Sequence, residues 1–154
     1  MISIRISEQT LTHHRQSGVS VCYPVSTAAA GSGNQRDSLQ TPLGRHRIAK
    51  KIGEDMPLCT AFTARMPVGI YEQTFSNSKK DWILSRILWL EGMQTGLNRR
   101  GPVDTLSRFI YIHGTHQEDL IGTPASHGCI RMRNVDVLQL FAHAREGETV
   151  YIRP

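Results

Sequence analysis

The sequence lacks any long hydrophobic run. No stretch of the 154 residues approaches the roughly 20 apolar residues that a membrane-spanning helix needs. Met1 to Ile6 alternates apolar and polar side chains, which is typical of a strand and not of a signal peptide. We therefore expect no membrane partner and a cytoplasmic location, or a periplasmic one if a leader has been removed.

Cysteine is also scarce. Cys22, Cys59 and Cys129 are odd in number and widely spaced, which argues against a disulfide framework and favours a reducing compartment. Internal repeats and low-complexity segments are absent. The length and the 39% of hydrophobic residues are ordinary for one globular core. We expect a single domain over residues 1–154.

Acidic residues are fewer than basic ones, which gives a formal net charge of +5. A positive potential near a cleft concentrates anions, so the balance fits a substrate with several carboxylates. It would also fit nucleic acid. However, the basic residues form scattered short pairs such as Lys50-Lys51 and Arg99-Arg100, without a recognisable nucleic-acid module. No nucleic-acid partner is expected.

One short segment combines a thiol, two imidazoles and two glycines in its two end parts, His113-Gly114-Thr115 and Ser126 to Met132. The first part begins at the end of Arg108 to His113, a β-branched and aromatic run that predicts a strand with Phe109, Tyr111 and His113 on one face. Gly114 predicts a turn that ends this strand. His113 would then stand at the strand tip.

The second part of the segment is Ser126-His127-Gly128-Cys129. A thiol attacks a carbonyl only as the thiolate, and histidine is the usual base that generates it. Gly128 permits backbone conformations that aim neighbouring amides at one spot, which suits an oxyanion. If the chain is extended from Cys129 to Met132, Cys129 and Arg131 face the same side. The pattern indicates a nucleophile site.

These residues resemble the signature of the L,D-transpeptidase catalytic domain, a family of cysteine acyltransferases that act on peptidoglycan stem peptides. That signature is a histidine followed by Ser/Thr-His-Gly-Cys. Weaker similarities extend the resemblance from about Val19 to the end of the chain, at Tyr23 to Thr27, Thr41 to Gly44, Ile83 to Gly92, Gly96 to Asn98 and Ile110 to Gly114.

The resemblance implies a role for each residue of the motif. Cys129 is the nucleophile, His113 is the base, and the backbone carbonyl of Gly114 orients the imidazole. His127 and the amides of Gly128 and Cys129 line the oxyanion hole.

Two residues of the motif are candidates for substrate binding. Arg131 stands where the family often has asparagine, and its planar fork suits either a substrate carboxylate or an internal salt bridge. Ser126 is the other candidate, and the alternative for it is a structural role in which its hydroxyl bonds to loop backbone. The segment from His113 to Ser126 is short for the family. The sequence therefore does not decide whether Thr115 to Ala125 forms a wall of the substrate site.

The resemblance also implies the reaction. Cytoplasmic relatives are L,D-carboxypeptidases that remove the terminal D-alanine from recycled murein tetrapeptides. With the expected location, this makes L,D-carboxypeptidase the favoured activity, with a peptidoglycan-derived tetrapeptide or muropeptide as substrate and no cofactor. The alternative is an L,D-transpeptidase that cross-links stem peptides or exchanges D-amino acids through the same Cys129 thioester.

More distant alternatives are a non-catalytic binding protein and a zinc site. His113, His116, His127 and Cys129 form His-x-x-His and His-x-Cys pairs, although zinc sites usually show tighter spacings.

The predicted fold is mainly β, and the resemblance implies a β-sandwich of mixed sheets with peripheral helices. The pattern predicts six strands, at Met1 to Ile6, Gly18 to Ser26, Arg45 to Ile52, Ile83 to Leu90, Arg108 to His113 and Thr149 to Ile152. Ile83 to Leu90 also suits a helix, and only the resemblance favours a strand. Tyr71, Trp82 and Trp89 are candidates for either the core or the cleft wall.

One helix is predicted from Asn134 to Arg145. In this prediction Asn134 caps it, Gly147 stops it, and Val135, Leu138 and Ala142 form its apolar stripe.

Overall fold

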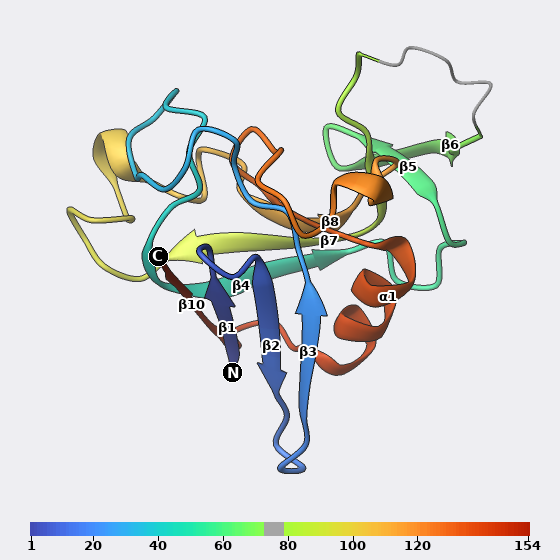
Figure 1. Ribbon diagram of the computed structural model, residues 1–154, viewed down its shortest axis with the longest axis horizontal. Coiled ribbons are helices and arrows are strands. Elements are labelled where there is room, and N and C mark those ends of the chain that lie inside the picture. Colours follow the sequence, from blue (N-terminus) through green and yellow to red (C-terminus); the bar gives the residue numbers. More distant parts are fainter. Residues whose placement is uncertain (73–78) are drawn as a thin grey trace.

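The computed structural model describes residues 1–72 and 79–154 (Figure 1). Within these ranges the chain forms ten strands, one α-helix and two short 3-10 helices. The bounds are β1 Ile2–Arg5, β2 Thr10–His14, β3 Ser20–Pro24, β4 Gly44–Ile52, β5 Thr60–Thr63, β6 Met66–Ile70, β7 Ile83–Gly92, η1 Gly101–Val103, β8 Tyr111–Gly114, η2 Glu118–Leu120, β9 Ile130–Met132, α1 Asn134–His143 and β10 Thr149–Arg153.

All ten strands belong to one curled mixed sheet. Its order is β3-β2-β1-β10-β4-β7-β5-β6, and β8 pairs with β7 and then with β9. The pairs β1/β10 and β8/β9 are parallel, whereas the others are antiparallel. The prediction of a mainly β fold with mixed strands is confirmed, and hydrogen bonds join the strands into one continuous sheet.

The main core lies inside this curl and is closed by α1, which packs against β7 and β8 (Figure 1). The strand β7 is buried along most of its length and is a central strand, which pairs with β4 and β5 on one side and with β8 on the other. A strand covered on both faces needs a continuous apolar run. This explains why apolar and polar side chains do not alternate from Ile83 to Leu90. The prediction of a strand for this segment is confirmed.

The predicted strand from Arg108 to His113 is wrong at its start. It begins at Tyr111 and includes Gly114, so Gly114 does not form a turn that ends it. Phe109 has a φ of 55° and is half exposed, so it does not share a strand face with Tyr111 and His113. The pattern also missed β2, β5 and β6, which are short and, in β6, contain a proline.

The helix is where predicted, but its details differ. It ends at His143 before Gly147, its N-cap position is Arg133, and Asn134 makes no cap bond. The buried face is formed by Asn134, Val137, Leu140 and Phe141, whereas Val135 and Ala142 are exposed. The predicted stripe was therefore wrong, because the face toward β7 and β8 starts one position earlier in the helical period.

Within the described ranges, no helix has the length and apolar character needed to cross a membrane.

Candidate active site

The strands β8 and β9 bring the two halves of the motif together. They run side by side in parallel, with His113 opposite Arg131 and Ile112 opposite Ile130. Cys129 directly precedes β9 and lies beside Tyr111, the residue before Ile112 in β8. The backbone N–H of Tyr111 points to Sγ of Cys129 at 3.4 Å. Paired residues of neighbouring strands project to the same face. His113, Cys129 and Arg131 therefore share one face of the sheet.

The ring of His113 is fixed by the backbone of the next residue. It is 1% exposed, and its Nδ1 lies 2.6 Å from the carbonyl oxygen of Gly114. A carbonyl can only accept a hydrogen bond, so Nδ1 carries the proton and Nε2 keeps its lone pair when the ring is neutral. Burial lowers the pKa of His113, although the carboxylate of Asp81 acts in the opposite direction. The ring is thus neutral and basic at Nε2 near neutral pH.

The thiol of Cys129 is held among backbone groups. Its Sγ also lies 3.5 Å from the carbonyl oxygen of Phe109, and burial raises the pKa of Cys129 to about 11. The thiol is therefore protonated near neutral pH and needs a base. Among the described residues its hydrogen-bond partners are Tyr111 and Phe109, not His113. Catalytic contacts of this kind are often loose in the free enzyme and tighten with substrate.

Ser126 braces the turn before the nucleophile. It is buried, donates through Oγ to the carbonyl of Cys129 at 2.6 Å, and accepts from the amide of Gly128 at 3.2 Å. The carbonyl of Gly128 accepts from Thr41 Oγ1 at 3.0 Å. Gly128 has a φ of 132°, which only glycine adopts readily. The amide of Gly128 therefore faces Ser126, which leaves the amide of Cys129 as the backbone candidate for the oxyanion hole.

Arg131 forms an internal ion pair. It is 2% exposed, and its Nη2 lies 2.8 Å from Asp81 Oδ2, while Nη1 donates to Gln117 Oε1 at 3.2 Å. Of the two interpretations open for this arginine, the salt bridge is thus present. Its Nε and Asp81 Oδ1 are both buried without a hydrogen-bond partner in the described part of the chain, so the pair meets at one point only.

Asp81 was not found from the sequence, since it lies in no motif and precedes β7 by two residues. Besides Arg131 it meets the exposed His127, whose Nδ1 is 3.5 Å from Oδ2. Burial alone would raise the pKa of Asp81, but His113, Arg131 and His127 together hold it below its usual value. Asp81 is therefore an anion at neutral pH, which contacts Arg131 and His127 and acts electrostatically on His113.

Asn134 was predicted to cap the helix, but in the structure its side chain makes two hydrogen bonds beside the candidate site. Its Nδ2 donates to the carbonyl of Thr115 at 2.8 Å, and its Oδ1 accepts from Ser85 Oγ at 2.7 Å. Ser85 lies where β7 shifts register against β8, with a φ of 69°. Bulges often redirect side chains next to active sites. Asn134 thus ties α1 to the segment that follows His113 and Gly114.

The aromatic residues belong to two separate clusters. Trp89 packs against Phe109 and Tyr111, with ring centroids 5.9 and 5.8 Å away, in the same cluster as Cys129. Trp82 packs against Tyr71, in the cluster formed with Ala61 and Leu84. Trp89 is therefore the tryptophan that lies near the thiol.

The candidate zinc ligands do not converge. In residues 1–72 and 79–154, no group of three or more His, Cys, Asp or Glu side chains is placed to hold a metal ion. His116 instead lies beside Tyr71, with ring centroids 5.5 Å apart.

Residues 1–152 match the family model described as the L,D-transpeptidase catalytic domain, YkuD. The chain belongs to this family. The resemblance noted from the Ser-His-Gly-Cys motif is thereby confirmed, over almost the whole chain. A stretch of 43 residues is 49% identical to YkuD of Bacillus licheniformis and covers 28% of this chain and 26% of that protein.

Solved L,D-transpeptidases share the fold. The protein from Xylanimonas cellulosilytica aligns with a TM-score of 0.59 and 16% identity, covering 99% of this chain and 59% of that one. The Enterococcus faecium enzyme, solved as a cysteine-to-serine mutant, gives 0.59 and 15%, covering 99% and 48%. L,D-transpeptidase 3 of Mycobacterium tuberculosis, with a faropenem-derived adduct, gives 0.57 and 17%, covering 99% and 59%. The chain thus spans about half of these structures and about a quarter of the curated relative.

Proposed function

We propose that this protein is an L,D-carboxypeptidase that removes the terminal D-alanine from a peptidoglycan-derived tetrapeptide through a thioester on Cys129. The proposal depends above all on one observation. His113 has its Nδ1 committed to Gly114 and shares a sheet face with the Cys129 thiol. A neutral imidazole with a free Nε2 beside a protonated thiol is the arrangement that general-base activation requires.

In the first half of the reaction, Nε2 of His113 takes the proton of the Cys129 thiol. At the same time Sγ bonds to the carbonyl carbon of the diaminopimelate residue, which precedes the terminal D-alanine in the tetrapeptide. The amide of Cys129 and the side chain of His127 stabilise the oxyanion. When the carbon–nitrogen bond breaks, the same imidazole returns its proton to the leaving nitrogen, and D-alanine departs as the amine. The peptide remains as a thioester on Cys129.

In the second half, water attacks the thioester carbonyl and the released sulfur regains a proton, which yields the tripeptide and free Cys129. Water is the acceptor in this proposal because we place the protein in the cytoplasm, where recycled peptides are trimmed. Support for that location comes from its three cysteines, all of which are free thiols.

A second candidate is an L,D-transpeptidase, and it is favoured by the names of the solved relatives, which are L,D-transpeptidases. The first half of the reaction is unchanged. The side-chain amine of another stem peptide, in place of water, resolves the thioester and forms a cross-link.

The test is incubation with disaccharide tetrapeptide, followed by mass spectrometry of the products and of the intact protein. Tripeptide with free D-alanine supports the carboxypeptidase, whereas dimers or exchange of the terminal D-amino acid support the transpeptidase. Cys129→Ala should abolish both the products and the acyl adduct, and Cys22→Ala, at an exposed thiol, is the matched control. Unchanged turnover in Cys129→Ala would reject both candidates.

A further inference from the structure

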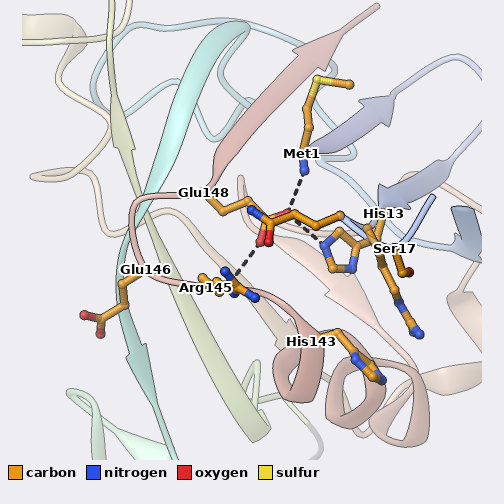
Figure 2. A pocket seen from close by; sticks show the side chains of 9 residues that line it. Met1, His13, Ser17, His143, Arg145, Glu146 and Glu148 are labelled. Atoms are coloured by element: carbon orange, nitrogen blue, oxygen red, sulfur yellow. Dashed lines mark hydrogen bonds and ion pairs between the residues drawn. The ribbon is translucent and has the colours of Figure 1, made fainter. Parts of the chain in front are cut away.

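A hollow of about 420 Å³ lies near the β2–β3 hairpin, between β2, the end of α1 and the turn before β10 (Figure 2). Its lining is rich in basic and imidazole groups, which come from Met1, His13, Arg15, His143 and Arg145. None of these residues belongs to the acyl-transfer site.

The two carboxylates in this hollow are already engaged. Glu148 Oε1 lies 2.7 Å from the ammonium group of Met1 and 2.8 Å from His13 Nε2, and its Oε2 accepts from the amide of Arg145 at 3.0 Å. Glu146 accepts from the amide of Lys51 and points away from the group in Figure 2. Within residues 1–72 and 79–154, neither carboxylate forms an ion pair with a guanidinium.

The two guanidinium groups of the lining, in contrast, have no ion-pair partner in the described ranges. Nε and Nη2 of Arg15, which are both donors, are buried without a hydrogen-bond partner in the described ranges. Arg145 is exposed, and its guanidinium has no ion pair among the described residues. A buried donor without an acceptor costs about 1–3 kcal/mol. The hollow therefore combines unpaired positive charge with donors that lack acceptors.

We propose that this hollow binds a small organic anion, whose phosphate or carboxylate oxygens pair with Arg15 and Arg145. A guanidinium presents its N–H groups in a planar fork that matches either oxyanion. The volume lies within the usual range of small-molecule pockets. It is far larger than the roughly 30 Å³ taken up by one water molecule, so the ligand carries an organic part beyond its charged group.

The test is calorimetric titration of the full chain with inorganic phosphate and, separately, with glutarate. Glutaramide, which has the shape of glutarate without its charges, is the neutral control. Saturable binding of at least one anion and none of glutaramide is expected, and the tighter anion distinguishes a phosphate from a carboxylate ligand. Arg15→Gln and Arg145→Gln should each weaken that binding about tenfold, as expected for loss of one charge-assisted contact.

Arg5→Gln is the matched control, because Arg5 is exposed and lies outside the hollow. Arg145 is exposed, so its variant remains informative if Arg15→Gln fails to fold by circular dichroism. The proposal is overturned if neither anion binds saturably or if Arg5→Gln weakens binding as much as the other two variants. It is also overturned if Cys129→Ala abolishes binding, which would place the anion at the acyl-transfer site.

Discussion

Arg131 and Asp81 form an ion pair, 2.8 Å from Nη2 to Oδ2, next to His113 on the neighbouring strand. The two charges act on the proposed catalytic groups, His113 and Cys129, in opposite directions. Asp81 raises the pKa of both His113 and Cys129, whereas Arg131 lowers both. In the proposed reaction the imidazole must be neutral and the sulfur must become an anion, so both groups depend on the balance between these two charges.

The pH profile of the wild-type enzyme is the first prediction. Burial lowers the pKa of His113 below 6.5, and only its neutral form can accept the thiol proton. We therefore expect kcat/KM to fall as pH drops through that lowered value. The pKa of Cys129 is about 11, so no loss is expected from about pH 7 to about pH 9. A decline of activity across this alkaline interval would contradict general-base activation.

Asp81→Asn tests the ion pair. Loss of the carboxylate removes the charge that raises the pKa of His113, so the acid limb of kcat/KM should move to lower pH. The variant also leaves Arg131 buried without its anion, and breaking a fully buried ion pair lowers the free energy of unfolding by about 3–5 kcal/mol. Because Asp81 is partly exposed, we expect a smaller loss of stability than this. Asp119→Asn, at an exposed carboxylate, is the control. An acid limb that stays in place would show that Asp81 does not act on His113.

Ser126→Ala tests the brace before the nucleophile. The hydroxyl bonds to the carbonyl of Cys129 and to the amide of Gly128, so its loss should disturb the position of Sγ more than substrate binding. We expect kcat to fall about tenfold, with KM changed little, and stability to drop by about 1–3 kcal/mol. Steady-state kinetics with urea unfolding measure both. Ser107→Ala, at an exposed serine, is the comparison, and a change in KM alone would point to direct substrate contact instead.

Glu148→Gln is predicted to destabilise the fold without changing the reaction. Burial raises the pKa of Glu148, but the ammonium of Met1, the amide of Arg145 and the ring of His13 outweigh it and hold the pKa below 4.5. The carboxylate therefore stabilises the fold fully above pH 4.5, and this stabilisation is lost as pH falls through the lowered value.

The expected loss for Glu148→Gln is about 1–3 kcal/mol near neutral pH, measured by urea unfolding across pH. The gap to wild type should close as the solution is acidified below pH 4.5. The exposed Glu8 offers a control in Glu8→Gln. A gap that is independent of pH would show that the charge of Glu148 does not contribute.

The family and the main residues of its motif were readable without coordinates. A histidine before glycine, followed by Ser-His-Gly-Cys, is local in the chain, and its chemistry depends on residue types and spacing. The buried strand β7 was correctly predicted but only through resemblance, because a run such as Ile83 to Leu90 suits a helix and a covered strand equally. The buried face of α1 was misassigned because a helix with several apolar residues permits more than one apolar stripe along its surface.

The sequence by itself determined which atoms can do chemistry: a thiol at Cys129, an imidazole at His113 and a glycine that frees the backbone between Ser126 and the nucleophile. Only the tertiary structure decided which charges surround them. Asp81 is 50 residues before Arg131 in the chain, and no local pattern joins them. The curled sheet brings them within 2.8 Å, because long-range strand pairing, and not local propensity, sets which side chains meet.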